Sequence, residues 1–358
     1  MKNIPFYKPN YIKDEYLQRV LKDDFAAVEA LRDKLLAIHK GQKIVLANNQ
    51  TQALHLLFRA MEIKRADKII CSVNAFVNIA QVIRYFDAEP LFVDIDASMN
   101  MDMALLERTL ATHSSKKLKA ICFNHVAGLA ADCDALLALA NKYNVKLINV
   151  AGPALGLKLK GFASCFNFAH REKEPVFNGS YLLMDDEGLH QRALLLKNYG
   201  INSSFDSAYE MQDLGLDCGL SSVDAALCMV RLGHLEDEIK QRQKIAALYQ
   251  ERLASCLHIS LPEDKPGHLY TQFIVRVDKN RDSFAAALKD KGIETGLHFT
   301  PLHTLFYYKN KYGFKINDFP AALNNFAQVM SLPIYAGLSL KDAAYIADTI
   351  CKVDADWI

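Results

Sequence analysis

Short β-branched runs alternate with stretches of helical periodicity through the first two-thirds of the chain, and no other feature constrains the fold as strongly. Several of these runs show little polar alternation, which is typical of strands buried on both faces. The predicted strands are 68–72, 91–95, 118–123, 146–150, 165–168 and 181–184. The predicted helices between them include 53–61, 78–85 and 134–143. This alternation indicates an α/β fold with a mainly parallel sheet.

A long charged helix and a second, smaller unit follow the alternating part. The helical pattern covers residues 222–253, and a turn marked by proline and glycine comes after it. An alternating strand at 273–277 and a helix at 283–291 then begin a new unit. At about 100–200 residues per domain, 358 residues correspond to one large domain and a smaller one. We predict a large domain over 1–239 and a small C-terminal α/β domain over 240–358.

Charge and cysteine content exclude several classes of function. The net charge of +1 provides no field that would gather nucleic acid or an anionic membrane, so neither is an expected partner. The first residues lack the apolar core of a signal peptide, and no apolar run is long enough to span a bilayer, which predicts a cytoplasmic protein. The eight cysteines are scattered without Cys-x-x-Cys spacing, which predicts buried reduced thiols rather than disulfides or a metal site.

Fragments spread over nearly the whole chain occur in a recognisable order. They include Asn-Gln-Thr-Gln-Ala-Leu-His-Leu at 49–56 and Glu-Pro-Leu-Phe-Val-Asp-Ile-Asp at 89–96. The other fragments are 4–9, 125–134, 291–303 and 332–339. In this order they resemble the sugar-nucleotide aminotransferases of the DegT/StrS type. The resemblance implies the type I fold of pyridoxal-phosphate (PLP) enzymes, with a mainly parallel seven-stranded sheet. It also implies a homodimer with active sites at its interface, and sugar-nucleotide substrates in surface-polysaccharide or related pathways.

The segment that carries the Schiff-base lysine in this family departs from the family pattern at that residue. Residues 166–186 align without a gap and put Glu172 in the lysine position. An aldimine to PLP needs an amine, and a carboxylate cannot form one. Lys173 comes next, but it serves only if the backbone slips by one residue, which turns an extended side chain to the opposite face. His170 and Glu172 share a face of an extended segment, where they could form an acid–base pair.

Other contacts that the resemblance implies for the cofactor have changed as well. Val150 stands where an aspartate keeps the pyridine nitrogen protonated, and valine can neither ionise nor hydrogen-bond. Asn167 replaces a phosphate-binding serine, while Gln50 and Thr51 stand at a Gly-Thr pair whose glycine permits close backbone approach. Asp217 replaces an interface asparagine, and a carboxylate about 4 Å from a phosphate charge costs about 4 kcal/mol at an effective dielectric of about 20. Together with Glu172, these changes indicate a relaxed or redirected constraint on the whole cofactor site.

Some residues near the implied site are retained. Phe76 matches the aromatic residue that lies over the cofactor ring, although a phenylalanine at a helix start is also a common core residue. His298 and His303 belong to the small-domain fragment, where the family uses such residues near the substrate. Their spacing around Pro301 is poor for a metal pair, so we predict packing or a substrate hydrogen bond and no metal.

These observations lead to one main hypothesis and two alternatives. We predict a homodimeric homologue of the sugar-nucleotide aminotransferases that needs no cofactor and does not transaminate through an internal aldimine. Such a pseudoenzyme would assist or regulate an active paralogue, or bind a nucleotide sugar through its small-domain residues. The first alternative is an active PLP-dependent sugar aminotransferase that uses Lys173. The second is a cofactor-independent enzyme that uses His170 and Glu172 in the same pocket.

Overall fold

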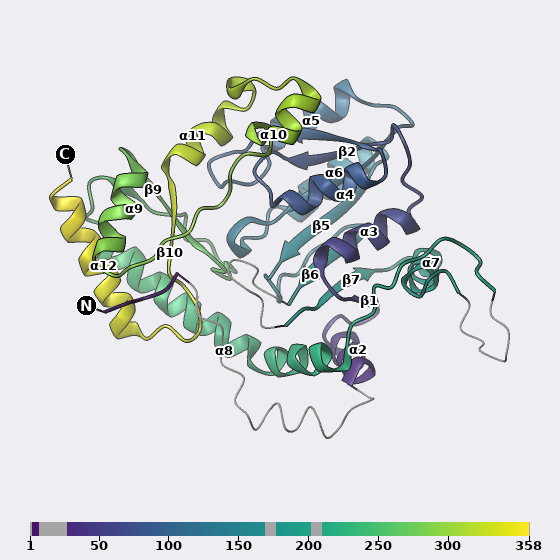
Figure 1. Ribbon diagram of the computed structural model, residues 1–358, viewed down its shortest axis with the longest axis horizontal. Helices are drawn as coiled ribbons and strands as arrows, with labels where there is room; N and C mark the ends of the chain where they lie inside the picture. Colours follow the sequence, from purple (N-terminus) through teal and green to yellow (C-terminus); the bar gives the residue numbers. More distant parts are fainter. Residues whose placement is uncertain (1, 7–26, 169–176, 202–209, 358) are drawn as a thin grey trace.

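A seven-stranded sheet forms the centre of the larger part of the molecule (Figure 1). The computed structural model describes residues 2–6, 27–168, 177–201 and 210–357. The strand order is β1-β7-β6-β5-β4-β2-β3, and all neighbours from β6 to β3 are parallel. Strand β7 runs antiparallel to both β1 and β6. The strands are β1 Lys43–Ala47, β2 Lys68–Ser72, β3 Glu89–Val93, β4 Leu118–Asn124, β5 Lys146–Gly152, β6 Ala163–Asn167 and β7 Ser180–Met184. The prediction of a mainly parallel α/β sheet is confirmed.

Helices cover both faces of this sheet because successive side chains of each strand point to opposite faces. In β4, Ala120 and Cys122 pack with α3 and α4, whereas Ile121 and Phe123 pack with α5 and α6. The helices on the first face are α3 Gln50–Ala60, α4 Val77–Tyr85 and α7 Glu187–Lys197. Those on the second face are α2 Ala27–Ile38, α5 Met103–Thr112 and α6 Cys133–Lys142, together with the start of α8.

The smaller part of the molecule contains a three-stranded antiparallel sheet in the order β10-β9-β8. Its strands are β8 Ile259–Ser260, β9 Phe273–Val277 and β10 Val329–Leu332. Its helices are α9 Arg281–Asp290 and α12 Leu340–Ala355. Between β9 and β10 lie α10 Phe306–Tyr312 and α11 Pro320–Gln328, whose Tyr308 and Ala322 pack into the core of the large sheet. Short 3-10 turns are η1 Val126–Gly128, η2 Leu302–Thr304 and η3 Ile316–Asp318.

Helix α8, Ser222–Leu253, links the two parts and matches its predicted bounds. Its first half packs beside α2 and β7 through Leu232, and its second half enters the core of the small sheet through Ile245. Figure 1 shows α8 running beneath both parts of the molecule. Midway along it, the buried Arg242 donates from Nε to the Leu269 carbonyl oxygen at 3.0 Å. The boundary at 239/240 falls inside this continuous helix and stays a prediction.

Several simple features of the described residues bear on function. The eight cysteines are free thiols, with Cys133, Cys256 and Cys351 only half-buried. Among the described residues, no three His, Cys, Asp or Glu side chains group as metal ligands would. No helix in the described part of the chain is long and apolar enough to cross a membrane.

Candidate functional site

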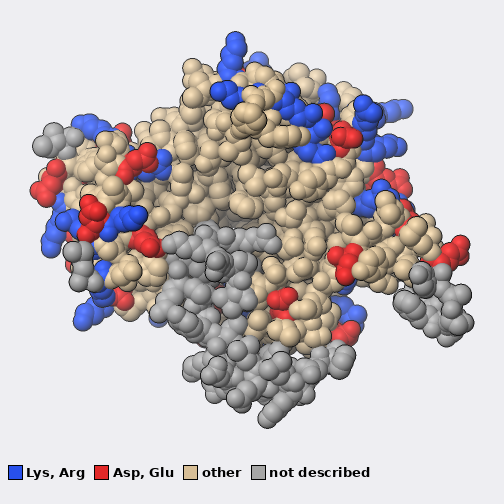
Figure 2. Space-filling model, in the orientation of Figure 1, with Lys and Arg blue, Asp and Glu red and all other residues tan. Residues whose placement is uncertain are grey.

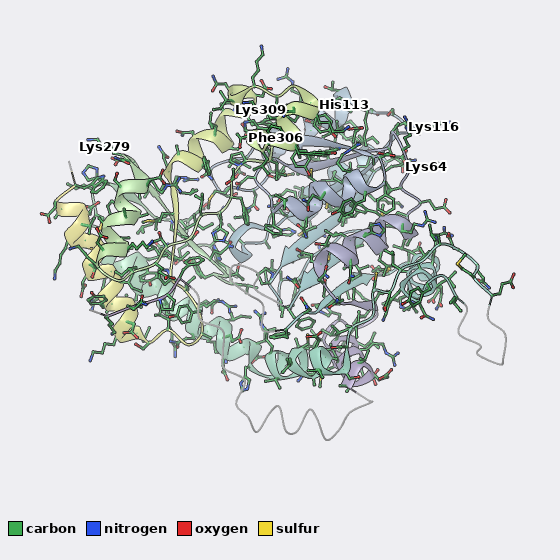
Figure 3. The ribbon with its side chains drawn as sticks, in the orientation of Figure 1. Lys64, His113, Lys116, Lys279, Phe306 and Lys309 are labelled. Carbon is green, nitrogen blue, oxygen red and sulfur yellow. The ribbon has the colours of Figure 1, made fainter. Side chains whose placement is uncertain are left out.

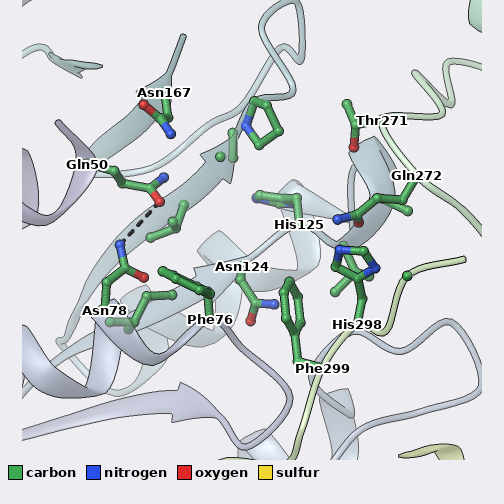
Figure 4. Close-up of a pocket in the computed structure, with 18 of the residues that line it drawn as sticks. Gln50, Phe76, Asn78, Asn124, His125, Asn167, Thr271, Gln272, His298 and Phe299 are labelled. Atoms are coloured by element: carbon green, nitrogen blue, oxygen red, sulfur yellow. Dashed lines mark hydrogen bonds between the residues drawn. The ribbon is translucent and has the colours of Figure 1, made fainter. Parts of the chain in front are cut away.

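A cavity of about 450 Å³ lies at the carboxyl ends of β4, β5 and β6. Segment 295–299 and residues Thr271 and Gln272, from the smaller part of the molecule, close it on the other side (Figure 4). Ligands of open parallel sheets bind at this edge. The volume lies within the range of about 300–1,000 Å³ that is usual for ligand pockets. We therefore take this cavity as the candidate functional site.

The beginnings of α3 and α4 form one wall of the cavity. The side chain of Asn49 caps α3 by accepting a hydrogen bond from the Gln52 amide at 3.0 Å, which places Gln50 and Thr51 in the first turn. Phe76 precedes α4 and is 46% exposed, so one side of its ring is open to the cavity. Helix N-termini favour an anion by about 0.3–1 kcal/mol each. This wall alone therefore attracts negative charge only weakly.

Gln50 and Asn78 form an amide pair on this wall. Asn78 Nδ2 donates to Gln50 Oε1 at 3.3 Å, as the dashed line in Figure 4 shows. Gln50 Nε2 and Asn78 Oδ1 are both buried and have no hydrogen-bond partner among the described residues. One donor and one acceptor of the pair thus remain unsatisfied beside the cavity.

Asn124, at the end of β4, forms the floor of the cavity together with the neighbouring backbone. Its Nδ2 group donates to the Asn74 carbonyl oxygen at 3.2 Å. Asn74 in turn donates to the Met99 carbonyl oxygen and accepts a hydrogen bond from the Phe299 amide. The Asn124 Oδ1 atom is buried and has no partner within the described chain. This network orients Asn124 and connects the large sheet to segment 295–299.

His125 is held in a neutral form next to Asn124. Its Nδ1 atom accepts a hydrogen bond from the Ala131 amide at 3.2 Å, so its Nε2–H donates to Asn149 Oδ1 at 3.0 Å. Asn149 is completely buried and extends this series of hydrogen bonds by donating to the Lys160 carbonyl oxygen. Burial lowers the pKa of His125 to about 4, against a smaller opposite effect of the Asn149 hydrogen bond. The imidazole is therefore uncharged at neutral pH and has no free nitrogen for a ligand.

The opposite wall comes from the N-terminal residues and the smaller part of the molecule. Ile4 pairs with Ile293 through a parallel bridge, which brings Phe6 to the cavity. A Cβ atom at position 296 would lie 2.6 Å from the Phe6 ring, so this close approach requires Gly296. His298 is buried, and its Nδ1 atom lies 2.7 Å from Ser331 Oγ. The Phe299 ring centroid lies 6.4 Å from that of Phe76.

The structure brings most of the sequence-predicted residues that it describes to this one cavity. They are Gln50, Thr51, Phe76, Val150, Asn167 and His298. Val150 is 5% exposed near the end of β5, and Asn167 ends β6.

Two predicted residues lie away from the cavity. Asp217 is exposed and accepts hydrogen bonds from Tyr199 Oη at 3.1 Å and from the Gly219 amide at 3.2 Å. His303 is buried, with its Nε2 atom 3.0 Å from the Ile316 carbonyl oxygen. The remaining predicted residues, His170, Glu172 and Lys173, lie outside the described residues.

The described lining of the cavity contains no Lys, Arg, Asp or Glu side chain. Figure 2 shows most charged side chains toward the top and sides of this face, around a central area whose described residues are mainly uncharged. The labelled cations Lys64, Lys116 and Lys309 in Figure 3 lie at the outer edge of the larger part, away from the cavity. Among the described residues, neutral amides, hydroxyls and aromatic rings are thus the groups that a ligand would meet.

Comparison with known proteins identifies the family of this chain. The sequence pattern of the DegT/DnrJ/EryC1/StrS aminotransferase family matches residues 14–351. The chain belongs to this family. The spore coat polysaccharide biosynthesis protein SpsC of Bacillus subtilis is 28% identical over 347 residues, which cover 90% of this chain and 88% of SpsC.

Solved aminotransferase structures share the fold. Helicobacter pylori PseC, an aminotransferase involved in the biosynthesis of pseudoaminic acid, superposes with a TM-score of 0.91 at 20% identity. That match covers 99% of this chain and 100% of PseC. The sugar aminotransferase Spr1654 of Streptococcus pneumoniae gives 0.90 at 23% identity, over 99% of this chain and 100% of the other. These likenesses confirm the PLP fold type I.

The described residues of this family member do not fit PLP. The ring nitrogen needs an acidic partner, and Val150 offers none. The phosphate needs cationic groups or several donors. The described wall offers no cation, the Gln50 amide and the Thr51 hydroxyl as donors, two weak helix N-termini, and two unpartnered carbonyl oxygens, Asn78 Oδ1 and Asn124 Oδ1. His125 is neutral and fully hydrogen-bonded. No step of a reaction is therefore derived through this cofactor.

The sequence analysis missed Asn78, Asn124 and His125 as site residues. The position of Asn124 and His125 at the end of a predicted parallel strand was an available signal, because ligands bind at such ends. Asn78 carried no comparable signal, since an asparagine in the first turn of a helix is common for capping reasons alone.

Proposed function

We propose that this protein is a sugar-nucleotide aminotransferase homologue that works in polysaccharide or nucleotide-sugar biosynthesis without transaminating through an internal aldimine. In this role it is a cytoplasmic homodimer that binds a sugar-containing ligand, or acts as partner of an active paralogue. The family assignment and the likeness to SpsC support the pathway class. The observation that carries the proposal is the absence of charged side chains from the described lining of the cavity, with Val150 where the ring nitrogen would need a carboxylate.

Adding PLP to the purified full-length protein tests this proposal directly. We expect no visible absorbance of a protonated aldimine, and no mass increase by a pyridoxyl group after borohydride reduction. A reducible adduct on the wild-type protein would overturn the proposal. If Lys173→Ala then abolished that adduct, the protein would be the PLP-dependent aminotransferase of the first alternative.

The cofactor-independent alternative requires His170 and Glu172 to turn over a substrate. It predicts that a nucleotide sugar incubated with the protein is converted without PLP, and that His170→Gln and Glu172→Gln each stop this conversion. The reaction is followed by chromatography of the nucleotide sugar. If the wild-type protein left the nucleotide sugar unchanged, this alternative would be excluded and the proposed binding role would stand.

A further inference from the structure

Unsatisfied amide atoms cluster at the wall of the cavity. Gln50 Nε2, Asn78 Oδ1 and Asn124 Oδ1 are buried without a hydrogen-bond partner among the described residues. Asn78 and Asn124 are only 4% and 9% exposed, so bulk water barely reaches them. Proteins pair about 90% of such buried atoms, and leaving one unpaired is costly. Three such atoms at one cavity point to a ligand that completes their hydrogen bonds.

The pattern of donors and acceptors at this wall follows from the contacts. The Gln50–Asn78 pair presents one donor and one acceptor whichever way the two amides are turned, because turning both only exchanges their roles. Asn124 presents an acceptor, because its Nδ2 group is held by the Asn74 carbonyl oxygen. Terminal amide torsions are broad, so small rotations bring these atoms toward a ligand.

A hydroxyl group fits this pattern better than an anion does. A hydroxyl both donates and accepts, so it can satisfy the Gln50–Asn78 pair and the Asn124 oxygen alike. A phosphate only accepts, so among these three unpaired atoms it would meet one donor, Gln50 Nε2, and face two carbonyl oxygens. The N-termini of α3 and α4 favour an anion, which makes phosphate the competing ligand that an experiment has to include.

An aromatic platform stands beside these amides. Figure 4 shows Phe76 between Asn78 and Asn124 in this view, with Phe299 nearby. The 46% exposed Phe76 side chain offers an apolar surface that a ligand can cover. The cavity of about 450 Å³ has room for a sugar ring and its substituents.

We propose that this cavity binds an uncharged, hydroxyl-rich sugar ring in the place where relatives hold their phosphorylated cofactor. The hydroxyls bind to Gln50, Asn78 and Asn124, and the C–H face of the ring packs on Phe76. This inference rests on the proposed function, because PLP and a sugar ring cannot share the cavity.

Matched sugars provide the direct test on the full-length protein. Glucose, mannose, galactose and N-acetylglucosamine are each compared with their own 6-phosphates by saturation-transfer NMR and calorimetry, with inorganic phosphate as a further probe. We expect at least one neutral sugar to bind, and its 6-phosphate to bind about tenfold more weakly, because the phosphate leaves carbonyl oxygens unmet. The inference would be overturned if a 6-phosphate bound more tightly than its neutral sugar, if inorganic phosphate displaced the neutral sugar, or if no neutral sugar bound.

Variants assign the binding to this cavity. Phe76→Ala and Asn78→Leu should each weaken binding of the neutral sugar by about tenfold. Phe306→Ala, at an 84% exposed position on α10, is the matched aromatic control and should leave binding unchanged. Asn78→Leu alters a buried position, so its folding is checked by thermal unfolding. If Asn78→Leu does not fold, Phe76→Ala alone decides the test. Unchanged binding in Phe76→Ala would refute the inference.

The outcomes separate this inference from the proposed function. A borohydride-stable pyridoxyl adduct would overturn the proposed function, and the inference with it. A protein that forms no adduct and binds no neutral sugar would refute only the inference.

Discussion

At the scale of single residues, the described lining of the cavity consists of neutral groups, several of which hold one another in place. His125 and Asn149 satisfy each other, and Asn124 is oriented by Asn74. A buried polar group is tolerated when it is hydrogen-bonded, whereas an unpaired buried charge is very costly. The unpaired atoms of Gln50, Asn78 and Asn124 are buried beside the cavity, so they reach a ligand only when their amide groups rotate.

His125 should make the folded protein less stable in mild acid. Burial lowers its pKa from the ordinary value of 6.5 to about 4. Between these values the unfolded chain binds more protons, so the stability is fully present above pH 6.5 and is lost as the pH falls through 4. The shift corresponds to about 3 kcal/mol. We expect His125→Gln to remove about this much of the pH dependence of the free energy of unfolding, measured with urea from neutral pH down to about pH 4.

The wild-type protein, unfolded with urea over the same pH range, provides the control for this measurement. Equal slopes in wild type and His125→Gln would show that His125 does not titrate at the depressed pKa.

Restoring the lysine alone should not restore cofactor chemistry. Glu172→Lys supplies an amine, but Val150 still offers no partner to the ring nitrogen and Asn78 and Asn124 still face the cavity. We expect Glu172→Lys with added PLP to give no pyridoxyl mass adduct after borohydride reduction. A stoichiometric adduct would mean that the lysine was the only missing contact.

At the scale of elements, helix α8 holds the two cores together, and one glycine weakens it. A Cβ atom added at Gly233 would meet no other atom within 4 Å, and the φ of this residue lies outside the left-handed region. A helix-interior glycine costs about 0.5–1 kcal/mol relative to alanine. Gly233→Ala should therefore raise the free energy of unfolding by about that amount, measured with urea.

Gly296 is the matched counterexample. A methyl group there would meet the Phe6 ring at 2.6 Å, so Gly296→Ala should lower the free energy of unfolding by about 1–3 kcal/mol. If Gly296→Ala left the free energy of unfolding unchanged, the N-terminal residues would have moved aside at no cost.

The elements that could be predicted are those with a strong local pattern. Strands 68–72 and 273–277 and helix 222–253 match the structure at both ends. The prediction omitted β1, whose five residues form an edge strand, and α7, whose polar face obscures its periodicity. The antiparallel direction of β7 depends on its pairing with β1 and β6, which no local pattern specifies.

The candidate site could be predicted only in part. The resemblance to the family pointed to Gln50, Phe76 and Val150, which do line one cavity. The tautomer of His125 and the unpaired oxygen of Asn124 depend on partners far away in the sequence, so they became visible only in the fold.

At the scale of the whole molecule, apolar side chains gather on an exposed segment next to Asp217. Met211, Leu214 and Leu216 are 60%, 68% and 43% exposed. Exposed apolar clusters mark interaction surfaces in soluble proteins. We expect this segment to contact the partner in the proposed homodimer.

Leu214→Asp should weaken that homodimer. A carboxylate in an apolar interface loses its hydration without a partner, so the mass measured by light scattering should fall from twice the chain mass toward the chain mass. Leu257→Asp, at an 84% exposed position in the smaller part, should leave the mass unchanged. A wild-type protein with the mass of a single chain would refute the dimer itself.

The continuous helix α8 also limits how a ligand can enter. At 32 residues it is about 48 Å long, and both cores pack on it, so rotating one part against the other would bend it. Phe6 and residues 295–299 line the cavity, so a bound sugar would contact these two segments without a rotation of the two parts. We expect small-angle X-ray scattering to give the same radius of gyration with and without saturating sugar, while amide hydrogen exchange slows in those two segments.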